Sequence, residues 1–365
     1  MNVKSKLRSK KELKIPPHFG DFLSTGSTLL NLACAGHPDW GLRKGTYSYL
    51  VGDTNSGKSW FAHSCLAEAS INPAFDDYRL IFDNSESGAF MDIRRFFGSR
   101  LVDRLEPPAG TKEEPIFSST IEDFYFNLMA VLNGDKSVVY VLDSMDSVSS
   151  DPEIDKFEEK QEAVRKKRDK GKTVKVAGSY GDGKAKINSS SLRIAHNKVV
   201  ATNSILIVIG QSRDRIGYGA QFDPKTHAGG NAISFYSNCK IWFSIKEKLK
   251  GSYEGKPVEI GTLSKIRVRR TRITGRDRTV CVPIYHSVGI DDLGSMVDWL
   301  IEWKHWTEAK GIIDAQEFNL KVGREKLVHT IEEQGKEREL KDLTALVWGK
   351  IEEAIAIQRK SRYDN

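Results

Sequence analysis

Residues 46–59 read TYSYLVGDTNSGKS, and this stretch decides the fold. The β-branched and aromatic side chains of residues 46–51 predict a buried strand. Residues 52–59 fit the pattern G-x-x-x-x-G-K-[ST], in which glycines let the backbone wrap a phosphate with successive N–H groups pointing at the anion. Residues 60–70 have a helical composition, which completes the strand-to-helix context of this motif. We therefore expect ATP to be bound by Gly52, Asp53, Thr54, Asn55, Ser56, Gly57, Lys58 and Ser59.

Two side chains of the motif have distinct expected roles. Lys58 would reach the β- and γ-phosphates, and the Ser59 hydroxyl would bind Mg²⁺. Asp143 ends the apolar run 138–142, as a Walker B carboxylate does, and would hold Mg²⁺ through water opposite Ser59. The sequence therefore predicts a magnesium site formed by Ser59 and Asp143.

Hydrolysis also requires a group that orients or deprotonates the attacking water. Asp83 and Glu86, at the end of the apolar run 80–82, are the candidates. We favour Glu86, because a carboxylate one turn beyond a strand end can project over the γ-phosphate. Gln211 ends a further apolar run and opens a stretch rich in Gly and Arg, so it could sense the γ-phosphate and report it to a mobile loop.

The apolar runs also predict the fold class. Residues 79–83, 137–143 and 204–211 are short, nearly continuous apolar runs that alternate with helical stretches. Such runs suit parallel strands buried on both faces. The expected architecture is therefore α/β, with a mostly parallel twisted sheet flanked by helices.

Composition shifts suggest the domain boundaries. Residues 1–20 form a basic arm, 21–289 an ATPase core, and 290–365 a small helical, Trp-rich C-terminal domain with a solvated tail. Within the core, residues 151–190 are charged and then Gly- and Ser-rich, which predicts a long loop. No apolar run of about 18 residues is present, so no membrane span is expected. The four cysteines lack metal-site spacing, so a reducing cytoplasm is the simplest location.

The charge is modest overall but clustered. Lys and Arg total 56 against 49 for Asp and Glu, a net charge of +7. The basic residues concentrate at 165–175 and at 265–278, and each run alone is as compatible with a solvated face as with a polyanionic partner. If the first run does meet a polyanion, its candidate contacts are Arg165, Lys166, Lys167 and Arg168.

From residue 22 to residue 299 the order of motifs resembles the RecA recombinase family, including the viral RecA-like proteins. The segment Gln211-Ser-Arg-Asp-Arg-Ile-Gly, followed by Gly229-Gly-Asn-Ala-Ile-Ser-Phe-Tyr236, is similar to the family's second DNA-binding loop and the signature after it. The resemblance implies a RecA-type P-loop ATPase core, with Gln211 as the γ-phosphate sensor. It also implies DNA contacts within residues 212–230 and just beyond, from Arg213, Arg215, Gly229, Gly230 and Asn231.

The family also has a pair of lysines that reach the neighbouring subunit's ATP, and Arg270 and Arg272 stand at the matching position. The resemblance therefore implies a homo-oligomer whose ATP site is completed in trans. It implies a DNA-dependent ATPase that binds single-stranded and duplex DNA, as a filament or a ring, and promotes strand exchange. The expected location is the cytoplasm at the nucleoid, or a host cell if a virus encodes the chain.

Three departures from the family pattern leave alternatives open. The family's catalytic Glu follows its Asp by two positions, whereas Glu86 follows Asp83 by three. The basic segment 151–190 is much longer than the family's first DNA-binding loop, and residues 1–20 are too few for the long polymerisation helix of bacterial RecA. The alternatives are a ring-shaped RecA-fold helicase and an ATP-binding protein that coats DNA with weak hydrolysis.

Overall fold

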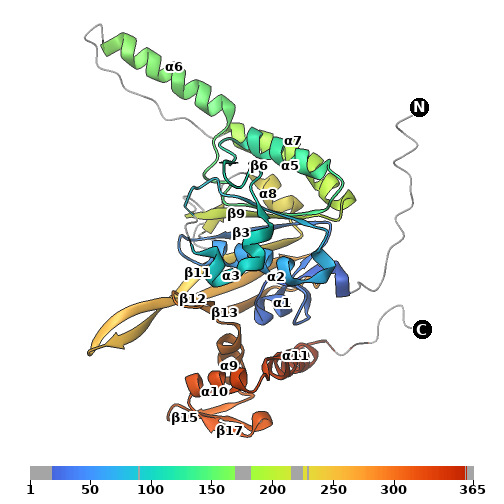
Figure 1. The fold of residues 1–365 in the computed structure, drawn as a ribbon, viewed down its shortest axis with the longest axis vertical. Coiled ribbons are helices and arrows are strands. Elements are labelled where there is room, and N and C mark those ends of the chain that lie inside the picture. The colour runs from blue at the N-terminus through green and yellow to red at the C-terminus, as the bar shows by residue number, and fades with distance from the viewer. Residues whose placement is uncertain are drawn as a thin grey trace, which may run out of the picture.

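The computed structural model describes residues 19–88, 91–168, 182–214, 225–227, 230–357 and 359 (Figure 1). Among these residues, ten strands form a central sheet in the order β14-β13-β12-β11-β3-β9-β8-β4-β5, with β10 paired to β9. The six strands from β11 to β5 form five parallel pairs, which confirms the predicted α/β class with a mostly parallel sheet. The strands are β3 (Thr46–Gly52), β4 (Arg79–Asp83), β5 (Leu105–Glu106), β8 (Val138–Leu142), β9 (Ile205–Asp214), β10 (Lys225–His227), β11 (Cys239–Tyr253), β12 (Lys256–Thr271), β13 (Arg278–Tyr285) and β14 (Gly289–Ile290).

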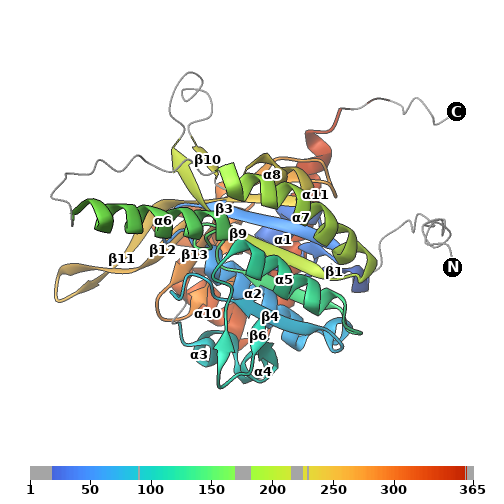
Figure 2. The same cartoon turned by 90° about the horizontal axis from the view of Figure 1, so that it is seen from above.

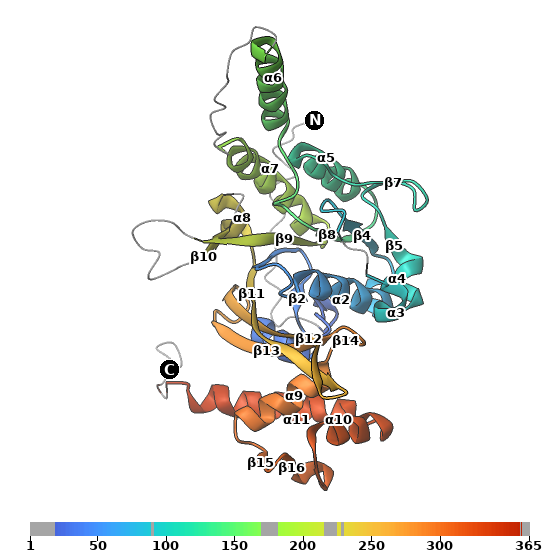
Figure 3. The ribbon, with the colours of Figure 1, turned by 90° about the vertical axis from the view of Figure 1, so that its left-hand side faces the viewer.

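Helices cover both faces of the sheet, which explains why its central strands are apolar throughout. Successive side chains of a strand point to opposite faces. In β3, Leu50 packs in the cluster that contains Phe61 of α2, whereas Tyr49 packs in the cluster that contains Phe124 of α5. Figure 3 shows α2 on one side of the sheet and α5 and α7 on the other. These helices are α1 (Thr28–Ala35), α2 (Lys58–Ile71), α3 (Ile93–Phe97), α4 (Ser99–Arg104), α5 (Ile121–Leu132), α7 (Asp182–Ala201) and α8 (Asn231–Tyr236).

The helix ends follow local sequence signals. Thr120 and Asp123 form a capping box at the start of α5, in which each side chain accepts a hydrogen bond from the other residue's backbone N–H. The Ser27 side chain accepts from the backbone N–H of Leu30 at the start of α1. Gly36 ends α1 with φ of 73°, a left-handed conformation that glycine adopts without strain.

The predicted loop at 151–190 is wrong for the part that the structure describes. Residues 151–168 form helix α6 (Asp151–Arg168), and α7 already begins at residue 182. The sequence signal was weak because α6 projects away from the body and buries no apolar stripe (Figure 1). Its helix instead comes from residues of high intrinsic propensity, such as Glu, Lys, Gln and Arg, with Asp151 and Glu153 in the first turn complementing the helix dipole.

Two further features lie on the same side as α6. Strands β11 and β12 form a long antiparallel hairpin that, like α6, extends beyond the body (Figures 1 and 2). Strand β9 does not end at Gln211 as predicted but continues to Asp214, because β10 pairs with it through Lys225, Thr226 and His227. The predicted second DNA-binding loop therefore begins as a two-stranded ribbon.

The C-terminal region contains the predicted helices and also an antiparallel sheet that the sequence did not reveal. Trp299 of α9 stacks on Trp348 of α11 with ring centroids 5.4 Å apart, so the Trp-rich pattern reflects a packed core. The elements are α9 (Asp292–Glu302), β15 (Thr307–Ala309), β16 (Ile312–Ala315), β17 (Leu320–Val322), α10 (Arg324–Glu333) and α11 (Glu337–Ala354). The three strands pair in the order β15-β16-β17.

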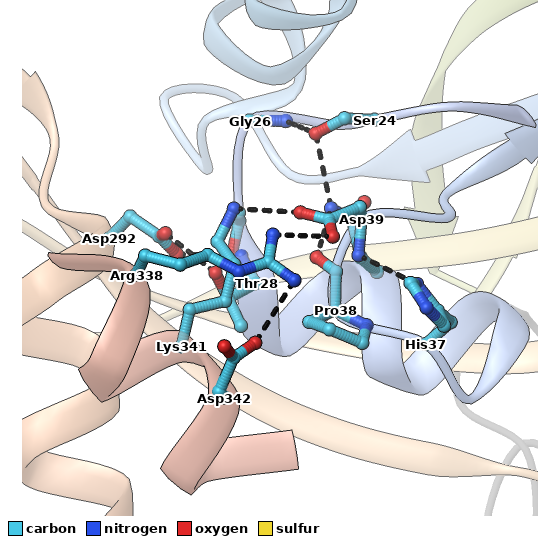
Figure 4. Close-up of polar contacts among 12 residues, drawn as sticks. Ser24, Gly26, Thr28, His37, Pro38, Asp39, Asp292, Arg338, Lys341 and Asp342 are labelled. Carbon is cyan, nitrogen blue, oxygen red and sulfur yellow. Dashed lines mark hydrogen bonds and ion pairs between the residues drawn. The ribbon is translucent and has the colours of Figure 1, made fainter. Parts of the chain in front are cut away.

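Buried and charged contacts fix this region against the core (Figure 4). The carboxylate of Asp292 accepts from the Thr28 backbone N–H at 2.6 Å and from its hydroxyl at 2.7 Å, so it lies at the N-terminus of α1. Arg338 and Lys341 of α11 both pair with Asp39, at 2.9 and 3.0 Å. The helix dipole of α1 and two cations thus stabilise carboxylates at this junction.

The remaining elements are short and peripheral. None of the helices in the described parts of the chain combines the length and the apolar character that a membrane crossing needs. The short elements are the turns η2 (Phe19–Asp21), η3 (Pro73–Phe75) and η4 (Gln316–Phe318) and the strands β1 (Phe22–Leu23), β2 (Leu42–Arg43), β6 (Ala109–Gly110) and β7 (Pro115–Ile116).

Candidate nucleotide-binding site

A pocket of about 450 Å³ opens at the carboxyl ends of the parallel strands. The phosphate loop between β3 and α2 forms its floor. Because β3, β8 and β9 are parallel, the residues that follow them reach the same edge of the sheet. The volume lies in the range of small-molecule sites. The lining residues are Thr54, Asn55, Ser56, Gly57, Lys58, Ser59, Trp60, Glu86, Gly88, Met91, Asp143, Gln211, Glu259, Thr262, Ile284 and His286.

The loop needs its glycines for space and for conformation. A Cβ on Gly52 would overlap the backbone carbonyl of Phe243 on the neighbouring strand β11. Gly57 has φ of 98° and faces Ile284, so a side chain there would be both strained and obstructed. Asn55 also has a positive φ, of 59°. The backbone therefore curls back on itself, the geometry by which such loops direct N–H groups at a phosphate.

Lys58 lies within this curl. Its ammonium donates to the backbone carbonyls of Gly52 at 3.0 Å and of Asp53 at 2.6 Å. Burial lowers the pKa of Lys58, while the nearby carboxylates of Asp143 and Glu86 oppose that shift. The cation is thus held over the loop at the position from which it would contact the phosphates.

Ser59 and Asp143 meet although 84 residues separate them. The Ser59 hydroxyl donates a 2.6 Å hydrogen bond to the Asp143 carboxylate. Burial raises the pKa of Asp143 to about 6, and the Glu86 charge adds to this, against the opposing hydrogen bond from Ser59. A hydroxyl and a carboxylate are the hard oxygen ligands that Mg²⁺ prefers, and a nearby cation would relieve the cost of burying the Asp143 charge. The two residues therefore fit the predicted magnesium site.

The two carboxylates considered for the water-orienting role lie in different surroundings. Asp83 is buried in the core, where it accepts from the Ser118 backbone N–H at 3.0 Å, the Ser118 hydroxyl at 2.6 Å and the Tyr140 hydroxyl at 2.8 Å. Glu86 lines the pocket. Asp83 is therefore a structural residue, and Glu86 is the carboxylate available to the nucleotide.

Glu86 is hydrogen-bonded to one residue that follows β8 and to one residue within β9. Its Oε1 accepts from the Ser144 hydroxyl at 2.6 Å and from Gln211 Nε2 at 3.1 Å. Its backbone N–H donates to the carbonyl of Asp143 at 3.0 Å. The extra residue between Asp83 and Glu86 thus does not remove Glu86 from the site, and it lies in direct contact with the proposed γ-phosphate sensor.

Gln211 connects the pocket to the ribbon formed by β9 and β10. Its backbone N–H donates to Asp146 at 2.6 Å, and the guanidinium of Arg213 pairs with the same carboxylate at 3.3 Å. The Arg213 side chain is 63% exposed, so it remains accessible to a phosphate backbone. Because Gln211 and Arg213 both bond to the Asp146 carboxylate, a displacement of Gln211 would also displace Arg213.

Arg270 and Arg272 lie away from the pocket of their own chain. Arg270 donates to the carbonyl of Ser234 at 3.3 Å and Arg272 to the carbonyl of Phe235 at 2.8 Å, near the C-terminus of α8. Both side chains are exposed. Neither residue lines the pocket of its own chain.

The predicted DNA-binding residues are only partly described. Arg165 and Lys166 are exposed on α6, and Lys166 pairs with Glu162 at 3.3 Å. Gly230 precedes α8 with φ of 82°. Lys167 and Arg168 belong to α6 and Asn231 to α8, but the structure does not describe their side chains, and Arg215 and Gly229 lie outside the described residues.

Sequence reasoning did not identify Asp146 or several of the pocket residues. Asp146 does not line the pocket but bonds to Gln211 and Arg213, and its position three residues after Asp143 is a signal that could have marked it. Trp60 follows directly on the phosphate motif. By contrast, Glu259, Thr262 and His286 come from the far side of the sheet, and no local pattern marks them. Only the pairing of β12 with β11 and β13 brings that side to the pocket.

Comparison with known proteins gives a consistent result. A family model described as the RecA N-terminal domain matches residues 173–291. The chain is similar to Protein RecA of Chlorobaculum tepidum, with 25% identity over 315 residues that cover 84% of this chain and 75% of that protein. It is similar to Protein RecA of Chloroherpeton thalassium, at 24% over 290 residues (77% and 68%), and of Bacteroides thetaiotaomicron, at 26% over 295 residues (76% and 72%).

Proposed function

The chain belongs to the RecA family, and from this premise we propose that it is an ATP-dependent DNA recombinase. It binds single-stranded DNA as an oligomer, hydrolyses ATP to ADP and phosphate, and promotes homologous pairing and strand exchange. The observation that carries the proposal is the hydrogen bond between Gln211 and Glu86. It places the end of the pocket that would face the γ-phosphate directly beside a ribbon that carries an exposed arginine.

In this mechanism the phosphate loop binds ATP through its backbone N–H groups and Lys58. Glu86 orients the attacking water and accepts its proton, and the hydroxyl of Ser144 positions the Glu86 carboxylate for this role. Ser59 and Asp143 would hold Mg²⁺, which would supply positive charge to offset that of the phosphates. The Gln211 amide is hydrogen-bonded to Glu86 and would therefore lie beside the terminal phosphate. Since ADP lacks this phosphate, Gln211 would distinguish ATP from ADP.

The DNA contacts follow from the exposed cations. Arg213 on the ribbon and Arg165 and Lys166 on α6 bind phosphates, so affinity falls with salt and depends little on sequence. Arg270 and Arg272 complete the ATP site of a neighbouring copy. Charge-assisted contacts of this kind with a transferring phosphoryl group are worth on the order of a thousandfold in rate.

The test is strand exchange between homologous single-stranded and duplex DNA, with ATP and magnesium supplied, together with negative-stain imaging of the same mixture. The proposal predicts helical filaments and joint-molecule formation by the intact chain, both lost in Lys58→Ala. Closed rings that unwind a forked duplex without pairing homologous strands would favour the helicase instead. Coated DNA with no phosphate release would favour the weakly hydrolysing coat protein.

A further inference from the structure

A second connection joins the phosphate loop to the ribbon, independently of Gln211. The carboxylate of Asp53, the second residue of the phosphate motif, accepts a hydrogen bond from the hydroxyl of Ser212 on β9. The same Oδ1 atom pairs with the ammonium of Lys225 on β10, at 3.0 Å. Lys225 also pairs with Asp214 at 3.2 Å. Both strands of the ribbon are therefore bonded to one side chain of the nucleotide site.

The two connections use opposite faces of β9. Gln211 and Ser212 are consecutive, so their side chains point to opposite sides of the strand. Gln211 reaches Glu86, whereas Ser212 reaches Asp53. Loss of one connection therefore need not remove the other.

The charges at Asp53 are consistent with an ion pair. Burial opposes ionisation, yet the hydrogen bonds from Ser212 and Lys225 outweigh it and lower the pKa of Asp53. Hydrogen bonds to Asp53 and Asp214 raise the pKa of Lys225. Both side chains are partly exposed, at 39% for Asp53 and 44% for Lys225. An exposed pair contributes little to overall stability, so its effect should lie in positioning.

The backbone of Asp53 also contacts the cation of the phosphate loop, because its carbonyl accepts from the Lys58 ammonium at 2.6 Å. A triphosphate brings several negative charges to this loop, and an uncompensated carboxylate there would repel them. Lys225 offsets the Asp53 charge only while the ribbon stays against the loop. ATP should therefore favour the docked ribbon, and by linkage the docked ribbon should favour ATP.

We infer that Asp53, Ser212 and Lys225 form a clamp that docks the β9–β10 ribbon on the phosphate loop and makes the affinities for ATP and for DNA depend on each other. The inference rests on the proposed function, since it assumes that the ribbon carries DNA contacts. Its residues are positioning residues, which act through Arg213 and the phosphate loop.

The test uses the intact chain and two readouts. One is the anisotropy of labelled single-stranded DNA with and without a non-hydrolysable ATP analogue, which gives the nucleotide-dependent gain in DNA affinity. The other is the affinity for a fluorescent ATP analogue without DNA. The variants are Lys225→Met, Ser212→Ala and the double variant Lys225→Met with Asp53→Asn. Lys321→Met, which removes an exposed lysine that pairs with Asp314 in the C-terminal region, is the matched control.

Lys225→Met should weaken ATP binding about fivefold and reduce the nucleotide-dependent gain about tenfold, within the usual range of coupling between sites. Adding Asp53→Asn should restore ATP affinity, because it removes the uncompensated charge, but not the gain. Ser212→Ala should reduce the gain without adding a charge, and Lys321→Met should change neither quantity. A merely structural role would lower the melting temperature of Lys225→Met and would not give this split between the two readouts.

The clamp would be overturned if Lys225→Met kept the full nucleotide-dependent gain in DNA affinity while Gln211→Ala abolished it. The proposed function would still stand in that case. Loss of ATP affinity that Asp53→Asn fails to rescue would also overturn it. If the unaltered chain showed no gain at all, the proposed function would fail together with the clamp. If Lys225→Met does not fold, Ser212→Ala decides by the same criterion.

Discussion

Gln211 Nε2 lies 3.1 Å from Glu86 Oε1, although 125 residues separate the two in the chain. The sheet produces this contact. Glu86 follows β4 and Gln211 lies in β9, with β8 between the two strands. Ser144, which follows β8, fills the gap by donating to the same carboxylate oxygen. The end of the pocket that would face the γ-phosphate is therefore built from residues in or after three neighbouring strands.

Glu86→Gln should lower the rate of ATP hydrolysis about 100-fold, because an amide orients the attacking water but does not deprotonate it. ATP should still bind, so DNA affinity with ATP should remain. The measurement is phosphate release with saturating single-stranded DNA. Glu325→Gln, which alters a carboxylate that is 85% exposed beside Arg324, is the control. Equal rates in the two variants would remove Glu86 from the mechanism.

Asp83→Ala should act on stability instead. It leaves the Ser118 N–H, the Ser118 hydroxyl and the Tyr140 hydroxyl without their buried acceptor, a loss of about 1–3 kcal/mol for each unsatisfied group. Urea unfolding should therefore show a lower free energy of unfolding. The Michaelis constant for ATP in the folded fraction should stay close to that of the unaltered chain, and a loss of turnover at unchanged stability would contradict the assignment.

Arg270 and Arg272 should act in trans. Lys58→Ala and the double variant Arg270→Ala with Arg272→Ala should each be inactive alone. Mixed in equal amounts, they should recover about a quarter of the normal ATPase rate, since random head-to-tail assembly gives that share of intact interfaces. The readout is phosphate release across mixing ratios. No recovery at any ratio would show that the arginines do not complete a neighbour's site.

Asp292 predicts a pH dependence of stability. Burial raises the pKa of this carboxyl above its ordinary value of 3.8, against the hydrogen bonds from Thr28. The protonated form of Asp292 therefore stabilises the folded state. This contribution is fully present below pH 3.8 and is lost as pH rises through the raised pKa of the folded protein. Asp292→Asn should gain free energy of unfolding relative to the unaltered chain as pH rises from 4 to 8. Urea titrations across this range provide the check, and a constant difference would refute the prediction.

The sequence predicted the parts of the site whose signal is local. The phosphate loop, Asp143 and Gln211 each stand at the end of an apolar run, and parallel strands bring such ends to one edge. The position beyond a strand end favours Glu86 over Asp83, and of these two carboxylates it is Glu86 that lines the pocket.

Most of the features that the sequence does not predict have no local signal. None of the described side chains of helix α6 is buried, so no hydrophobic periodicity marks the helix in the sequence. Thr262 and His286 reach the pocket only through antiparallel pairing of β12 and β13. The bond between Asp53 and Lys225 joins residues 172 apart, across a strand pairing that the sequence does not reveal.

We propose that Gln211 senses the terminal phosphate of ATP and that this contact determines the affinity for DNA. The most direct measurement is the dissociation constant for single-stranded DNA in the presence of ADP and of a non-hydrolysable ATP analogue, for the unaltered chain and for Gln211→Ala. We expect the analogue to tighten binding to the unaltered chain at least about tenfold and to have no effect on Gln211→Ala. Equal affinity in the two nucleotide states of the unaltered chain would contradict the account.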